Sequence, residues 1–317
     1  MVRLALAAVL CLAAAAAHAQ YPSRPIRLLV PNPPGGATDT LARLVAPKLG
    51  EALGQPLVVD NRPGSNGNLA SEMATKAPPD GYTLYLAADA QIVIGPHLYA
   101  SMPVDPVKEL APVATLVSTQ MMLVMRSDLP AASLQDFIAL AKKTAPPLPY
   151  ASIGNGSQHH LVMEMLKQRA GIDLLHVPFK GGGPAMTALL GGQVAAMFGG
   201  NSVSGQIRAG KVRALATAGK KRSSAFPDVP TLSETFPGLE VTPWLALFAP
   251  VGVPAAVLER VRDETSRLLA NEEMRGRIRR LGGLEPYVTT PEEFSALIRA
   301  AYARYGEIIK SVGAKVD

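Results

Sequence analysis

The stretch Arg27-Leu-Leu-Val-Pro-Asn-Pro-Pro-Gly-Gly-Ala-Thr-Asp-Thr-Leu-Ala-Arg43 combines the signals of a buried strand, a tight turn and a helix start. The apolar residues of 26–30 predict a strand that is covered on both faces. Gly35 and Gly36 allow a tight turn, and Thr38 or Asp39 is placed to cap the helix that follows. Unpaired amides and the positive end of the helix dipole then point into the loop. The turn is therefore expected to attract an anion, most simply a carboxylate or a phosphate.

The same arrangement of strand, glycine-rich turn and helix recurs three times. The further strands are predicted at 57–60, 149–153 and 174–179, and their turns are Asn61–Asn68, Gly154–Gln158 and Lys180–Pro184. Parallel sheets bind ligands at the carboxyl ends of their strands. Four such turns therefore predict two α/β sheets whose loops converge on one ligand.

The first nineteen residues have the features of a secretory signal peptide. Arg3 supplies a positive charge, residues 4–17 are apolar, and Ala17-His18-Ala19 matches the small-x-small cleavage pattern. We expect a mature chain that begins at Gln20 and is soluble in the periplasm. Cleavage removes Cys11, which is the only cysteine, so no disulfide is expected in the exported protein.

The charge of the chain favours small anions over nucleic acids. Its formal net charge is +6, but the basic residues of 260–280 alternate with acidic ones, as on a solvated helix face. Aromatic residues make up only 5% of the chain, and no basic run is interleaved with them. A mildly positive protein still attracts anionic ligands.

Alternating strand and helix signals predict an α/β fold. Two apolar strands at 112–118 and 121–126, and a later one at 244–249, could carry the chain between two domains. We expect a two-lobed periplasmic-binding-protein fold (type II-like), with a parallel-rich sheet in each lobe and a hinge of crossover strands. The expected boundaries are 1–19 for the signal peptide, 20–120 plus 240–317 for lobe I, and 121–239 for lobe II. Two consecutive independent domains would fit the periodicity as well.

Several motifs resemble catalytic or nucleotide sites but lack an essential residue. Gly205–Lys211 has phosphate-loop spacing, yet Val212 follows where serine or threonine is required. His159 and His160 are adjacent and cannot share a helix face as metal ligands would. No Gly-x-Ser-x-Gly elbow is present. Asp39 could pair with a histidine, but a capping or ligand-orienting role is favoured. We therefore predict no catalytic residue, metal site or cofactor.

Other polar residues on the four turns are weaker candidates for ligand contact. They are Ser65, Asn66, Ser157, Gln158, Lys180, Gly181 and Asn201. Each side chain could equally serve ordinary turn chemistry, and Lys180 could be a solvated loop lysine. Trp244 could line the cleft, although a core or hinge position is more usual for tryptophan.

Seven segments in a fixed order give the chain a specific resemblance. They are Val30–Asp39, Asp60–Gly64, Pro79–Thr83, Tyr150–Ser157 with His160-Leu161, His176–Gly181, Gly191–Val194 and Pro227–Thr231. Together they resemble the Bug family, the solute-binding proteins related to the binding component of tripartite tricarboxylate transporters. The resemblance covers essentially the whole mature chain.

This resemblance implies a periplasmic clamp that binds a small organic acid or amino acid. The Gly-Gly turn and its backbone amides would hold one carboxylate, partly through water, and the loaded protein would dock on a membrane permease or a sensor kinase. Asn32 stands where the family has an aromatic residue, which favours a more polar ligand. Ala195 and Ser65 also depart from the pattern, without disturbing the carboxylate-holding turn.

We therefore expect a monomeric, non-enzymatic carboxylate-binding protein with no nucleic-acid partner. Its first wall is predicted to be Gly35, Gly36, Ala37, Thr38 and Asp39. The alternatives are an exported α/β hydrolase or isomerase, which requires a histidine or carboxylate pair in the cleft, and a ligand-sensing adaptor for a membrane kinase.

Overall fold

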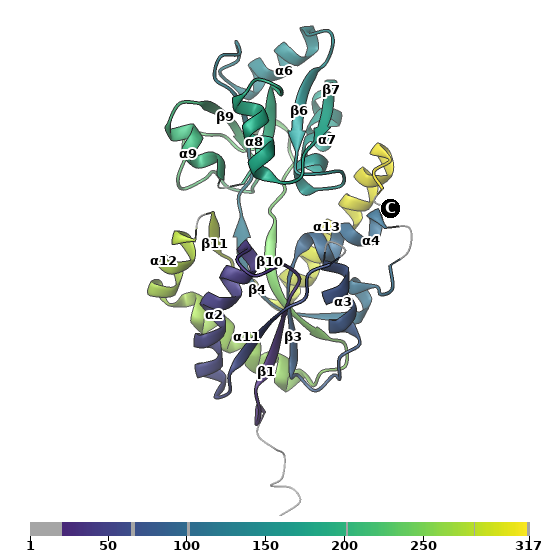
Figure 1. Ribbon diagram of the computed structural model, residues 1–317, viewed down its shortest axis with the longest axis vertical. Helices are drawn as coiled ribbons and strands as arrows, with labels where there is room; N and C mark the ends of the chain where they lie inside the picture. Colours follow the sequence, from purple (N-terminus) through teal and green to yellow (C-terminus); the bar gives the residue numbers. More distant parts are fainter. Residues whose placement is uncertain (1–20, 65–66, 100–101, 201, 282, 316–317) are drawn as a thin grey trace, which may run out of the picture.

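A computed structural model describes residues 21–64, 67–99, 102–200, 202–281 and 283–315 (Figure 1). The predicted signal peptide and the candidate residues Ser65, Asn66 and Asn201 lie outside these ranges. The described chain forms two sheets, each covered by helices. We call the part built on the six-stranded sheet lobe I and the part built on the five-stranded sheet lobe II. The predicted two-lobed α/β class is confirmed.

The sheet of lobe I takes strands from both ends of the sequence. Its order is β11-β4-β10-β3-β1-β2. The strands are β1 (Ile26–Val30), β2 (Leu57–Asn61), β3 (Thr83–Ala88), β4 (Leu110–Thr119), β10 (Trp244–Pro250) and β11 (Leu284–Pro286). β1 pairs in parallel with β2 and β3, whereas β10 pairs antiparallel with both β3 and β4.

Helices cover both faces of this sheet because successive strand residues point to opposite sides. Leu28 belongs to a core cluster with α2 (Ala37–Leu53), α11 (Ala255–Ala270) and α12 (Glu272–Arg280). The next residue, Leu29, belongs to the cluster on the other face. The elements on that face include α3 (Asn68–Thr75), the π-helical turn η2 (Ala90–Ile94), α4 (Gly95–Leu98), α5 (Pro106–Glu109) and α13 (Pro291–Val312).

The sheet of lobe II comes from the middle of the chain, in the order β7-β6-β8-β5-β9. Its strands are β5 (Met122–Arg126), β6 (Leu148–Ser152), β7 (Leu174–Pro178), β8 (Ala196–Gly199) and β9 (Val212–Thr217). One face packs on α8 (Gly182–Leu190) and α9 (Ser202–Arg208), and the other packs on α6 (Leu134–Lys143) and α7 (Gln158–Ala170). The short α10 (Leu232–Thr235) lies on the return path to lobe I.

The strands that carry the chain between lobes make both sheets mixed. β4 runs toward lobe II and β10 runs back, so these neighbours are antiparallel. β5 runs away from the hinge, whereas β6 and β8 end toward it, so β5 and β8 are antiparallel as well. Among the named strands, the parallel pairing predicted from alternation is found where β1 pairs with β2 and β3 and where β6 pairs with β7 and β8.

A further connection between the lobes was not predicted. The last turns of α13 extend beyond lobe I and pack beside α7 (Figure 1). Gln168 Nε2 donates to Ser311 Oγ at 2.7 Å, and the Arg304 guanidinium donates to the Glu240 carbonyl on the return path. The C-terminal helix therefore acts as a strap across the hinge, beside the two strand crossovers.

Some local features were not predicted. The mixed-charge segment 260–280 spans two helices, because Asn271 ends α11 and caps α12, accepting from Met274 N at 3.0 Å. The short elements β11, η2 and α4 were not predicted from the sequence. None of the helices in the described part of the chain combines the length and apolar character needed to cross a bilayer.

Candidate functional site

The loops at the strand ends of the two lobes enclose a cleft of about 740 Å³. Lobe I contributes the β1–α2 loop, the turn before α3 and the η2–α4 segment, and lobe II contributes the turn between β6 and α7. The lining residues are Pro31, Asn32, Pro33, Pro63, Gly64, Gly67, Asn68, Ala90, Gln91, Ile94, Gly95, Leu98, Tyr99, Ile153, Gly154, Asn155, Gly156, Ser157 and Lys315.

The amides of the first glycine pair, which were predicted to bind an anion, make hydrogen bonds within the protein in this structure. The Gly35 N–H donates to Asp39 Oδ2 at 2.8 Å, and the Gly36 N–H donates to the Pro33 carbonyl at 3.3 Å. Both nitrogens are thus occupied by the protein itself. None of Gly35, Gly36, Ala37, Thr38 and Asp39 lines the cleft, although Asn32 and Pro33 of the same loop do.

Asp39 fills the anion position of this turn with its own carboxylate. It is 2% exposed and accepts from Gly35 N, from Arg43 Nε at 3.0 Å and from Asn61 Nδ2 at 2.9 Å. Burial alone would raise the pKa of Asp39, but the hydrogen bonds from Arg43, Gly35 and Asn61 outweigh it and lower that pKa. The N-cap is Gly36, not Thr38 or Asp39 as predicted. Asp39 is therefore a structural anion that orients the loop.

Asn61 connects Asp39 to the cleft wall. Its side-chain amide also donates to the Asn32 carbonyl at 2.9 Å, which fixes the lining part of the β1–α2 loop. Gly67 has a φ of +96°, and a Cβ there would lie 2.7 Å from Gln91 Cγ, so this turn requires glycine. The candidates Ser65 and Asn66 lie outside the described residues, between the lining residues Gly64 and Gly67.

The lobe II wall is the turn that caps α7. Ser157 is the N-cap: its Oγ accepts from His160 N at 3.3 Å and donates to the Gly154 carbonyl at 2.7 Å. Gly156 has a φ of +69°, and a Cβ there would lie 2.5 Å from Leu98 Cδ2 in lobe I. Gly156 therefore packs closely against Leu98 of lobe I. Ser157 lines the cleft, and its contact with a ligand stays a prediction.

Gln158 connects the lobes instead of lining the cleft. Its Nε2 donates to Asp89 Oδ2 across the hinge. Asp89 is 3% exposed, and its burial raises its pKa to about 8, against the effect of the hydrogen bonds from Ala90, Gln158 and Trp244. Trp244 is 1% exposed and packs edge-on against Phe294. It is therefore a core residue, which is the more usual position for tryptophan.

Lys180 and Gly181 stand at the turn between β7 and α8. Lys180 is exposed, and Gly181 has a φ of +109° as the N-cap of α8. Neither residue lines the cleft. Of the predicted contacts in the described chain, the structure brings only Ser157 to the cleft wall.

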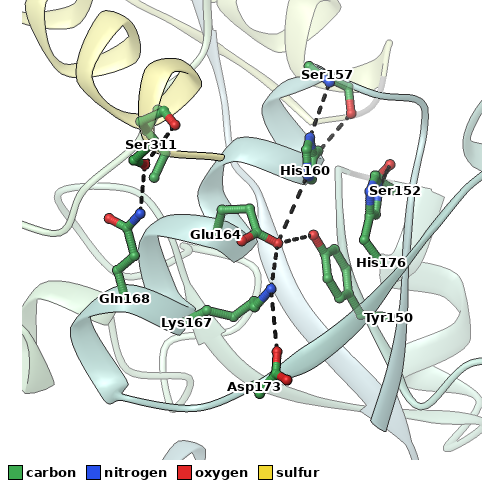
Figure 2. Close-up of polar contacts among 12 residues, drawn as sticks. Tyr150, Ser152, Ser157, His160, Glu164, Lys167, Gln168, Asp173, His176 and Ser311 are labelled. Carbon is green, nitrogen blue, oxygen red and sulfur yellow. Dashed lines mark hydrogen bonds and ion pairs between the residues drawn. The ribbon is translucent and has the colours of Figure 1, made fainter. Parts of the chain in front are cut away.

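A buried polar cluster on lobe II was not predicted. Figure 2 shows Glu164 accepting from the Tyr150 hydroxyl at 2.6 Å and from Lys167 Nζ at 2.9 Å. The rings of His160 and His176 stack with centroids 3.9 Å apart and planes 6° apart. Burial lowers the pKa of His176 to about 4, with a smaller contribution from His160. The sequence held one signal of this cluster: His160 and Glu164 are four residues apart on a helix, and side chains at that spacing are neighbours.

This cluster borders a second cavity of about 590 Å³, which shares Asn155 and Lys315 with the interlobe cleft. Its remaining wall is the end of α13 and the tail that follows. Among the described residues, no three histidine, cysteine or acidic side chains are grouped so that they could hold a metal ion. The two stacked histidines have hydrogen-bond partners within the protein: His160 Nδ1 accepts from the Gly156 N–H at 3.1 Å, and His176 Nε2 lies 2.7 Å from Ser152 Oγ.

The chain matches a known protein family. Residues 41–314 match the model of the tripartite tricarboxylate transporter family receptor. The protein BugT of Bordetella pertussis (strain Tohama I) is 35% identical over 299 residues, which cover 93% of this chain and 91% of that protein. Because the matched family is one of transporter receptors, the prediction that the chain is not an enzyme is confirmed.

Two solved structures are similar over nearly their whole length. Rpa4515 of R. palustris with adipate is 31% identical, with a TM-score of 0.77, and the match covers 93% of this chain and 99% of that one. MatC of Rhodopseudomonas palustris with bound malate is 31% identical, with a TM-score of 0.72 and coverage of 91% and 100%. The acids named with these two structures, adipate and malate, are small carboxylates.

Proposed function

This chain belongs to the tripartite tricarboxylate transporter receptor family, and we propose that it captures a small organic acid or amino acid by its carboxylate in the cleft between its lobes. The observation that carries the proposal is the cleft itself. It lies where the carboxyl ends of parallel strands from both lobes meet, which is where open α/β sheets bind ligands.

The lining chemistry suits a short acid. Asn32, Asn68 and Asn155 bring amide groups that can donate hydrogen bonds to carboxylate oxygens, and Ile94 and Leu98 offer apolar surface to methylene groups. With the amides of Gly35 and Gly36 engaged, we propose that the turns 63–68 and 153–157 hold the carboxylate, partly through water. The turn around Asp39 supports Asn32 from behind.

The finer predictions remain part of this proposal. We propose export through cleavage after Ala19, a monomeric mature protein, and lobe boundaries near residues 120 and 240. Delivery to the permease subunits of a tripartite carboxylate transporter is favoured over docking on a sensor kinase, since the matched family is named for the transporter. Disruption of the gene should abolish uptake of the identified acid; unchanged uptake with altered transcription would favour the sensor.

A ligand panel tests the proposed function. The mature protein from Gln20 onward is titrated with C3–C6 mono- and dicarboxylates, amino acids and neutral sugars, and thermal shift and calorimetry are recorded. A carboxylate should raise the melting temperature, because a ligand that binds only the native state stabilises it. Stabilisation by neutral sugars alone would refute the carboxylate assignment.

Variants of the cleft amides make this experiment specific to the site. Replacing Asn32 and Asn155 with alanine should weaken binding of the stabilising acid by roughly tenfold or more. The control is Gln193→Ala, an exposed amide outside the cleft, which should bind as the wild type does. If the cleft variants, the control and the wild type all bind the acid with equal affinity, the ligand binds elsewhere.

A further inference from the structure

We propose that Lys315 pairs with the second carboxylate of a dicarboxylic acid in the interlobe cleft and makes the protein selective for diacids over monoacids. The inference rests on the proposed function and specifies the ligand class of the same site. It rests on the charge of the cleft lining and on the way in which the end of α13 is held.

Charge is the first observation. Among the described residues that line the cleft, Lys315 is the one with a charged side chain. Neutral amides and turn backbone can satisfy one carboxylate by hydrogen bonds. A second carboxylate that leaves water needs a cation or further donors, because an uncompensated charge is costly to desolvate. Lys315 is the cation placed to serve it.

The backbone at the end of α13 gives Lys315 a defined position. Gly313 adopts a left-handed conformation with a φ of +65°, and its N–H donates to the Ile309 carbonyl. The Ala314 N–H donates to the same carbonyl at 3.2 Å. This C-terminal capping turn redirects the chain out of the helix axis. The residue after it, Lys315, thus reaches the junction of the two cavities.

Lobe II holds the same end of the helix in place. Gln168 of α7 donates to Ser311 Oγ, and Ser311 donates to the Ile308 carbonyl at 2.8 Å (Figure 2). Lys315 is an exposed residue that follows a helix of lobe I whose end is bonded to lobe II, and it lines both cavities together with Asn155. An acid that bridges the two lobes would meet this cation at the lobe II end.

Other lysines near the cleft do not have this position. Lys167 lies in the neighbouring cavity and is paired with Glu164 at 2.9 Å. Lys180 is exposed and does not line the cleft, and Lys310 is an exposed residue of α13. Lys310 thus provides a matched control on the same helix.

The test uses pairs of acids that differ by one carboxylate. Succinate, glutarate and adipate are compared with butyrate, pentanoate and hexanoate by calorimetry on the wild type, Lys315→Met, Lys315→Arg and the control Lys310→Met. Lys315→Met should weaken binding of the preferred diacid by about tenfold and leave the matching monoacid within about twofold. Lys315→Arg should retain most of the affinity, and Lys310→Met should be indistinguishable from the wild type.

Two further measurements separate charge from structure. The diacid affinity of the wild type should fall with added salt more steeply than that of Lys315→Met. The melting temperatures of the unliganded variants should agree. An equal loss for diacid and monoacid, or no loss for either, would overturn the role of Lys315.

The two proposals fail in different ways. A wild type that binds only monoacids would refute the role of Lys315 and leave the proposed function intact. A wild type that binds no carboxylate would refute the proposed function, and this inference with it.

Discussion

Asp39 occupies, with its own carboxylate, the place at which a helix N-terminus would otherwise attract an external anion. Its three donors come from the glycine turn, from its own helix and from β2. In this structure the anion that accepts from the turn is the carboxylate of Asp39 itself. Only Gly35 and Arg43 are sequence neighbours of Asp39. The contact with Asn61 depends on strand pairing, which local sequence does not reveal.

Replacing Asp39 with asparagine should reduce the free energy of unfolding by about 1–3 kcal/mol, since the charge-assisted bonds are lost and partly buried donors lose their acceptor. Because the folded pKa of Asp39 is lowered, its contribution is present above the usual pKa of a carboxyl and is lost as the pH falls. Urea unfolding at pH 7 and pH 4 should show the deficit shrinking at low pH. The exposed Asp228→Asn is the control; a stable Asp39→Asn protein that no longer binds the acid would show direct ligand contact instead.

Asp89 should give the opposite pH dependence. Its folded pKa of about 8 lies above the ordinary value, so the native state retains a proton that the unfolded chain releases above about pH 4. The wild type therefore loses stability relative to Asp89→Asn as the pH rises from 4 to 8. Melting curves of both proteins across this range should diverge, while effects of the buried histidines cancel in the difference. Parallel curves would contradict the buried, protonated Asp89.

At the scale of elements, the turn between β6 and α7 packs closely against Leu98 of lobe I. Its glycines and its N-cap Ser157 were visible in the sequence, because the turn chemistry is local. The mixed pairing of the sheets was not visible. It follows from the crossover strands β4, β5 and β10, whose direction depends on the path of the whole chain. The short β11 escaped prediction because three residues carry no periodic signal.

Gly156→Ala should separate the lobes and weaken binding of the identified acid by roughly tenfold, or about 1.4 kcal/mol. A Cβ at this position collides with Leu98, and the left-handed backbone is strained as well. The control is Gly171→Ala, which has a φ of +61° and open space around it. It should cost about 1 kcal/mol of stability without changing the affinity. Equal affinities for the two variants would show that the Gly156 contact does not matter for binding.

At the scale of the molecule, the lobes are joined by strand crossovers and by α13. The apolar strands that were predicted at 112–118, 121–126 and 244–249 correspond to β4, β5 and β10. The strap formed by α13 could not be predicted, because its contacts with α7 join residues such as Gln168 and Ser311 that are remote in sequence. For the same reason, the position of Lys315 at the cleft could not be predicted from the sequence.

The most direct measurement is a crystal structure of the mature protein with the acid that stabilises it most. We predict that one carboxylate lies between residues 153–157 and the described residues Gly64, Gly67 and Asn68, beside Asn32, and that a second carboxylate lies next to Lys315. An acid bound outside the interlobe cleft, for instance in the apolar groove beside Val107 and Ile298, would contradict the account.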